Sequence, residues 1–268
     1  MTVHTLITVT DRRYLANCTL VLKSFRTGFP TADIAIWVNS GTNATEILEL
    51  SGKEPGCKDA VLIPLGSTLH HAEWIRKVIN GHNGHDPLVI VDPDVHFWKS
   101  CEDWRFNSLM AGFHVPEMFN DWAQCKSFER LHTSFLWFKD TNALKHKIHD
   151  AYPWANKTQG EYCPCDPFMP SVKFIRGEPV FWDTCAVLYN MIGGEAFTPE
   201  HLACYEHLNS AGFVQTITDR MGGKTGQDFR LFHELAPLNM EFVRQFSWSL
   251  TDKYYRKKAL EAQLTKPK

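Results

Sequence analysis

Two aspartates separated by one proline follow an unbroken apolar run. Asp92 and Asp94 come directly after residues 88–91, Leu-Val-Ile-Val. Such a run is typical of a strand buried on both faces of a parallel sheet, so the carboxylates are expected at the edge where open α/β sheets bind ligands. Two carboxylates at this spacing can converge on one hard divalent cation, and that cation can neutralise a diphosphate. The segment therefore indicates a Mn²⁺ or Mg²⁺ site. The alternative is that Asp92 and Asp94 only end the strand and cap the next turn.

The elements that must position these carboxylates alternate between strand and helix patterns. This alternation predicts βαβ units and a mainly parallel sheet flanked by helices. Strands are expected over residues 5–10, 34–38, 60–64 and 88–91, and helices over residues 14–25, 45–50 and 72–79.

In the second half of the sequence the alternation of strand and helix patterns is less regular, which predicts an α+β continuation of the fold. Strands are expected over residues 111–115 and 134–138, and helices over 141–151, 184–191 and 199–211. Residues 154–179 are rich in Pro, Gly, Cys and aromatic side chains, which favours an ordered loop that covers a site. No linker interrupts the sequence, so residues 1–268 are expected to form one domain.

The bulk composition excludes several classes of protein. A hydrophobic fraction of 44% with 22% charged residues is ordinary for a globular chain, and a formal charge of -2 gives no general attraction to nucleic acid. The start lacks the pattern of a secretory signal, and no apolar stretch is long enough to span a bilayer. A cytoplasmic protein without a transmembrane segment is expected, with its 8 cysteines mostly reduced.

Four segments together resemble the GT-A glycosyltransferases, which use nucleotide sugars as donors. They are LITVTDRRY, VIVDPDVHF, HTSFLWFKDTNAL and PVFWDTCAVLY, and the match thins after Tyr189. The resemblance implies a Rossmann-like GT-A fold. By this resemblance we expect a nucleotide-sugar-binding half over residues 1–98 and an acceptor-side half over 99–250, and the basic residues of the tail predict a C-terminal helix over 251–268.

The resemblance also implies a metal site and a donor site. Asp94 would bind the metal directly, and Asp92 would bind it through water or contact the ribose of a UDP-sugar. A late histidine often completes the metal site in this fold, and His207 is the first choice, with His233 as the reserve. Either histidine could instead be structural.

Other segments would contact the nucleotide and the acceptor. By the same resemblance, Thr8, Thr10 and Asp11 would hold the base. Asp183 would remove the proton from the acceptor hydroxyl, orient a substrate, or simply cap the helix that follows it. Positive side chains that could balance the leaving diphosphate are Arg76, Lys77 and Lys224.

The acceptor and the reaction class have alternatives. A surface or lipid-linked glycan is favoured as acceptor, and a hydroxymethylated base in phage DNA stays open because the tail, residues 253–258, is basic. The same paired aspartates would also suit a nucleotidyltransferase. A non-catalytic nucleotide-binding or carbohydrate-binding protein is the third interpretation.

Overall fold

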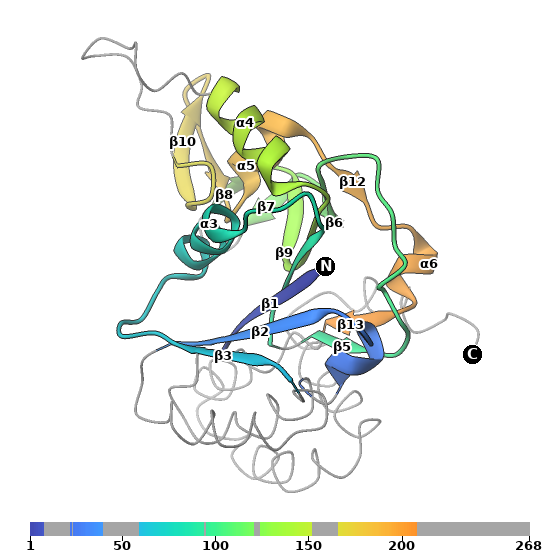
Figure 1. Cartoon of the computed structure of the whole chain (residues 1–268). Coiled ribbons are helices and arrows are strands. Elements are labelled where there is room, and N and C mark those ends of the chain that lie inside the picture. The colour runs from blue at the N-terminus through green and yellow to red at the C-terminus, as the bar shows by residue number, and fades with distance from the viewer. Residues whose placement is uncertain are drawn as a thin grey trace, which may run out of the picture.

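The computed structural model of the chain describes residues 1–7, 22, 24–39, 59–93, 95–120, 124–151 and 166–207. These ranges form a mixed α/β fold with a seven-stranded sheet, a four-stranded sheet and a two-stranded sheet (Figure 1). The large sheet has the spatial order β12 (Glu195–Ala196), β6 (Met110–Val115), β9 (Arg130–Phe138), β4 (Leu88–Val91), β1 (Thr2–Ile7), β2 (Asp33–Val38), β3 (Val61–Pro64). The predicted α/β class is confirmed.

Parallel pairing joins the strands of the first half. β1 pairs in parallel with β2 on one side and with β4 on the other, and β3 pairs in parallel with β2. The chain therefore adds two strands on one side of β1 and then crosses to its other side. This change of direction makes the carboxyl ends of β1 and β4 the switch point of the sheet, where α/β folds bind ligands. β9 then pairs antiparallel with both β4 and β6.

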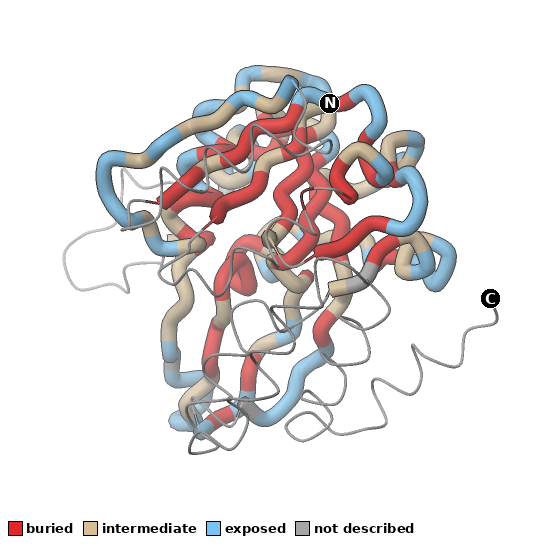
Figure 2. Tube along the Cα trace, turned by 90° about the horizontal axis from the view of Figure 1, so that it is seen from below, coloured by how far each residue is buried: buried red, intermediate tan, exposed pale blue. Residues whose placement is uncertain are grey.

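The central strand β4 is buried on both faces, as its apolar run predicts. Val89 and Val91 belong to one hydrophobic core, and Leu88 and Ile90 belong to the other, which also contains Trp74. The alternation follows from the two-residue period of a strand. Figure 2 shows buried segments along the middle of the molecule and exposed residues in the surrounding turns.

Three helices contribute to the core that contains Leu88 and Ile90. They are α3 (His71–Gly81), α4 (Thr141–Ala151) and α5 (Ala186–Ile192), and Figure 1 shows them close together. The helices predicted over residues 72–79 and 141–151 are confirmed, and the third begins two residues after its predicted start at 184. Among the described residues, no helix has the length and apolar content needed to cross a bilayer.

Two boundaries in the first half differ from their prediction by three residues. β1 begins at Thr2, ahead of the predicted start at 5, because Thr2 already pairs with Asp33 and Leu88. Residues 24–28 are helical, so Gly28 is the last helical residue and not part of a stop beyond residue 25. A side chain at Gly28 would collide with the ring of Phe97, whose Cγ lies 2.5 Å from the Cβ position. The helix predicted over 45–50 lies outside the described residues.

Part of the expected loop over residues 154–179 is a hairpin, so that prediction is wrong there. β10 (Ser171–Ile175) and β11 (Glu178–Trp182) pair antiparallel. Arg176 and Gly177 join them with φ values of 51° and 86°, the positive pair that a type I′ turn requires. The four-stranded sheet is completed by β8 (Cys125–Ser127) and β7 (Met118–Asn120).

The helix expected over residues 199–211 is also wrong. α6 (Pro199–Leu202) makes one turn, and the chain then forms β13 (Tyr205–His207), which pairs antiparallel with β5 (Val95–Phe97). The carbonyl of Cys204 accepts hydrogen bonds from the backbone N–H groups of Trp98 and Lys99, at 2.8 and 3.1 Å. This long-range pairing overrides the local helical pattern and places His207 on a strand.

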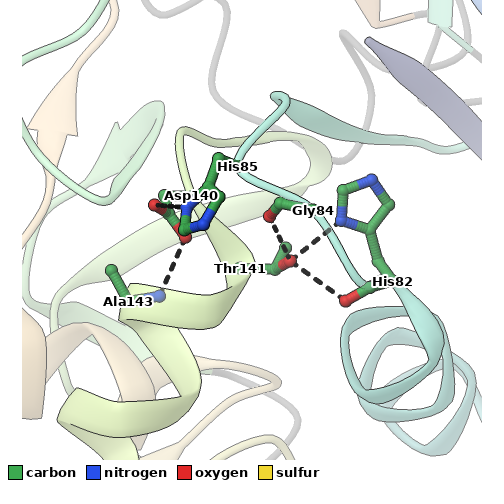
Figure 3. Close-up of polar contacts among 6 residues, drawn as sticks. All are labelled: His82, Gly84, His85, Asp140, Thr141 and Ala143. Carbon is green, nitrogen blue, oxygen red and sulfur yellow. Dashed lines mark hydrogen bonds and ion pairs between the residues drawn. The ribbon is translucent and has the colours of Figure 1, made fainter.

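A polar network joins the turn before β4 to the start of α4 (Figure 3). Asp140 accepts a hydrogen bond from Ala143 N at 2.8 Å, and its other oxygen lies 2.7 Å from His85 Nδ1. The buried Thr141 hydroxyl lies 3.2 and 3.3 Å from the carbonyl oxygens of His82 and Gly84. The network fixes α4 against the amino end of the central strand.

We expect Phe135→Ala to lower the free energy of unfolding by about 3–5 kcal/mol, because it removes a fully buried ring and leaves a cavity. The rings in contact with Phe135 are those of Phe29, Phe97, Trp104, Phe197 and Tyr205. Urea denaturation measures the loss. Val61→Ala, at a side chain that is 62% exposed, should change the value by less than about 0.5 kcal/mol. Equal effects of the two substitutions would contradict this core.

We expect His85→Gln to remove stability only in a window of pH. The hydrogen bond and charge of Asp140 raise the pKa of His85, and His85 with the N–H of Ala143 lowers the pKa of Asp140. The pair therefore stabilises the fold fully between the ordinary values of 3.8 and 6.5, and loses its effect below the lowered or above the raised pKa. Melting temperatures of the wild type and of His85→Gln, measured across pH, test this expectation. The same difference in melting temperature at every pH would refute it.

Candidate active site

Asp92 lies at the carboxyl end of β4, at the switch point of the sheet. Its backbone N–H donates to the carbonyl of Ser134 at 2.7 Å, and its own carbonyl accepts from Val95 N at 3.2 Å. The first bond continues the pairing of β4 with β9, and the second joins the end of β4 to the start of β5. The side chain is 22% exposed, so solvent and a ligand can still reach it.

Three histidines surround the carboxylate of Asp92. His71 Nε2, at the first position of α3, lies 2.9 Å from Asp92 Oδ1. Burial alone would raise the pKa of Asp92, but the histidines outweigh this effect and hold the pKa below its ordinary value. In order of effect, they are His71, His207 and His132. The carboxylate is therefore held in its ionised form, as a ligand for a cation requires.

β9 brings His132 to this site because it extends beyond the end of β4. The strand begins at Arg130, ahead of its predicted start at 134, while β4 ends at Val91 opposite Phe135. His132 Nδ1 lies 2.8 Å from Ser134 Oγ and accepts from Ser134 N at 3.2 Å, so the proton of the neutral ring is on Nε2. Burial, followed by the nearby His207 and Arg130, lowers the pKa of His132 to about 3. The ring is therefore neutral at physiological pH.

His207 reaches the same rim from β13. It pairs with Val95 of β5, three residues after Asp92, and its ring centroid lies 5.1 Å from that of His132. The structure thus brings together two of the predicted site residues, Asp92 and His207. The short strand β13 does this by pairing with the segment that follows the aspartates.

Asp183 is held by an ion pair. Its Oδ2 lies 2.6 Å from Arg130 Nη2, and its Oδ1 accepts from Thr184 N at 2.7 Å. The helix that follows has Cys185 as its N-cap, with no side-chain capping bond, so Asp183 accepts a backbone N–H without being the N-cap itself. Both carboxylate oxygens of Asp183 are engaged.

A second ion pair joins Arg76 of α3 to Asp166. Burial raises the pKa of the Cys185 thiol, and the carboxylates of Asp183 and Asp166 raise it further, so both ion pairs flank this residue. Cys185 has a φ of 62°, a left-handed conformation that is uncommon for a residue with a side chain. Two arginines and two aspartates thus meet at the start of α5.

Several predicted residues lie outside the described ranges. They are Thr8, Thr10, Asp11, Asp94, Lys224 and His233. Lys77 is described, and its ammonium group lies 5.9 Å from the ring centroid of Trp37. The described residues contain no group of three His, Cys, Asp or Glu side chains arranged to hold a metal ion. A metal bound by Asp92 and His207 would therefore need a further ligand, and Asp94 is the nearest carboxylate along the chain.

Sequence patterns missed His71, Arg130 and His132. His132 opens the segment HTSFLWFKDTNAL, which resembles the GT-A enzymes, but neither His132 nor Arg130 lies within the strand predicted over 134–138, and β9 in fact begins at Arg130. His71 stands in a histidine pair at the start of a predicted helix, a position that by itself indicates capping. None of the three could be assigned to the site without the register of the sheet.

Three solved structures are similar to the chain at low sequence identity. The galactosyltransferase LgtC, solved with donor and acceptor sugar analogs, matches with a TM-score of 0.38 and 12% identity, over 73% of each chain. A nucleoside-diphosphate-sugar pyrophosphorylase from Vibrio cholerae RC9 gives 0.41 and 12%, over 75% of this chain and 93% of that one.

The glycosyltransferase GlyE of Streptococcus pneumoniae TIGR4 gives a TM-score of 0.41 and 11% identity, over 96% of this chain and 63% of that one. No family model matches the sequence, and no curated protein matches it significantly. These are distant likenesses of fold.

We expect the Arg130–Asp183 pair to show energetic coupling in a double-mutant cycle. The Arg130 side chain is 13% exposed and that of Asp183 31%, so solvent screens the pair only in part. Unfolding of Arg130→Gln, Asp183→Asn and the double variant should give a coupling energy of about 1 kcal/mol. Strictly additive effects would show that the pair is not formed in solution.

Proposed function

We propose that this chain is a cytoplasmic, metal-dependent glycosyltransferase that moves a sugar from a nucleoside diphosphate sugar, such as a UDP-sugar, to a hydroxyl acceptor. The observation that carries this proposal is the position of Asp92. Its ionised carboxylate lies at the switch point of the sheet, partly open to solvent, with His207 close by. This is the place and the chemistry expected for a donor diphosphate held through a cation.

The proposed metal ligands fit a hard or borderline divalent cation, Mn²⁺ or Mg²⁺. Carboxylate oxygen and imidazole nitrogen are both ligands for Mn²⁺, and in our proposal Asp92, Asp94 and His207 supply them. The bound cation would neutralise the charge that develops on the departing nucleoside diphosphate. Thr8, Thr10 and Asp11 follow the other strand of the switch point, β1, and we assign them to the nucleotide.

The residues around α5 would bind the acceptor and take the proton from its hydroxyl group. In this proposal an acceptor hydroxyl approaches Asp183, whose Oδ2 takes the proton as the hydroxyl oxygen attacks the anomeric carbon. Arg130 fixes the orientation of that carboxylate through its contact at 2.6 Å. Ion-paired carboxylates and guanidinium groups also bind the hydroxyls of a sugar well. A glycan acceptor suits this polar surface, and a hydroxymethylated DNA base is the second acceptor to test.

We expect wild-type protein with MnCl₂ to hydrolyse at least one donor in a panel of UDP-sugars, and Asp92→Ala to reduce the rate by about 10²-fold or more. UDP release measures the rate. The matched control is Asp33→Ala, because Asp33 is an exposed residue at the opposite, amino end of β2.

Three results would contradict the proposal. Equal rates for the wild type and Asp92→Ala would show that Asp92 is not part of the active site. Release of pyrophosphate from a nucleoside triphosphate and a sugar phosphate would indicate a nucleotidyltransferase. Binding of UDP-sugars without hydrolysis or transfer to any acceptor tested would indicate a binding protein.

A further inference from the structure

One oxygen of Asp92 is already occupied by a side chain outside the expected ligand set. His71 Nε2 lies 2.9 Å from Asp92 Oδ1, and both side chains are mostly buried, at 29% and 22% exposure. The contact is one of ion-pair distance. Because an ionised carboxylate repels the lone pair of a bare ring nitrogen, we expect the proton of His71 to lie on Nε2, where it blocks this nitrogen from binding a metal.

The His71 ring is fixed by the helix on which it lies. His70 and Glu73 form a capping box around the first turn of α3: His70 Nδ1 accepts from Ala72 N at 3.2 Å, and Glu73 Oε2 accepts from His70 N at 3.1 Å. The His71 ring also stacks on the fully buried Trp74, with centroids 5.6 Å apart and an angle of 21° between the planes. The ring therefore has little freedom to turn away from Asp92.

The start of α3 is in turn attached to the sheet through Asn39. The buried Asn39 side chain donates to Leu69 O at 3.0 Å and accepts from Leu69 N at 2.9 Å. The backbone N–H of Asn39 donates to the carbonyl of Ile7, the last residue of β1, at 3.0 Å. Hydrogen bonds thus attach Leu69, two residues before His71, to the end of β1 through Asn39.

We propose that His71 is a positioning residue that holds Asp92 Oδ1, leaving Oδ2 for the ligand, and that Asn39 and the capping box set its place. The ligand in this statement rests on the proposed function, whereas the contact between His71 and Asp92 does not. Partners that orient a ligating side chain commonly change metal affinity or activity by about 10–100-fold when they are removed. His71 acts in this way on the carboxylate without touching the substrate.

Two substitutions separate the hydrogen bond from the ring stacking. His71→Gln retains an N–H donor but loses the aromatic ring, and His71→Phe retains a ring on Trp74 but loses the donor. With UDP and MnCl₂ as the probe, calorimetry should show affinity close to wild type for His71→Gln and about 10–100-fold weaker for His71→Phe. His149→Ala, at a residue whose side chain is 82% exposed on α4, is the control and should bind as wild type. Melting temperatures show that each variant is folded.

The opposite pattern, with His71→Phe binding well and His71→Gln poorly, would show that stacking is what matters and would overturn the proposal. Wild-type affinity in both variants would do the same. If the wild type itself fails to bind UDP with MnCl₂, the proposed function is in error, and the positioning role is then decided by a measurement that needs no ligand.

That measurement is the ¹⁵N NMR spectrum of the histidine side chains. We expect Nε2 of His71 to be protonated in the wild type, and its resonance to shift in Asp92→Ala while that of His149 does not. The proposal would be overturned, whether or not a nucleotide binds, by a neutral His71 with its proton on Nδ1. It would also be overturned if the ¹⁵N chemical shift of His71 Nε2 were the same in the wild type and in Asp92→Ala.

Discussion

A carboxylate that ends a buried strand must be paired, and this requirement organises the edge of the sheet. Asp92 follows a strand whose residues are all fully buried, so its charge begins close to a low-dielectric core. Water reaches the side chain only in part. The nearby histidines, His71 above all and then His207, offset the lost hydration and lower the pKa of Asp92. The other features of the site follow from which elements can deliver those histidines to one point.

Each histidine comes from a different element, and each element has its own structural reason to be there. α3 carries His71 to the site because Asn39 binds Leu69, the residue just before the N-cap of this helix. β9 delivers His132 because it extends beyond the end of β4. β13 delivers His207 because it pairs with β5. The site is therefore as rigid as the packing of the sheet, which suits a carboxylate that must hold a ligand in one place.

Among the described residues of the first half, the pattern predicted the strands and the helix over 72–79 well, because parallel strands buried on both faces leave a clear signal of continuous apolar residues. The second half was harder to read. The three-residue strands β5 and β13 are too short to show alternation, and residues 199–211 have a helical pattern that pairing with β5 interrupts after one turn. β5 and β13 form strands because they pair with each other, and a pairing between segments distant in the sequence leaves no pattern in either segment alone.

The sequence by itself determined the strands up to β4 and the pair of acidic residues after this central strand, since both depend on local apolar patterns and on adjacent residues. Only the tertiary structure decided which side chains meet Asp92. His71, His132 and His207 reach it from positions far apart in the chain, and Arg130 meets Asp183 in the same way. Those meetings depend on strand register and helix placement, which arise from packing across the whole sheet and not from any one segment.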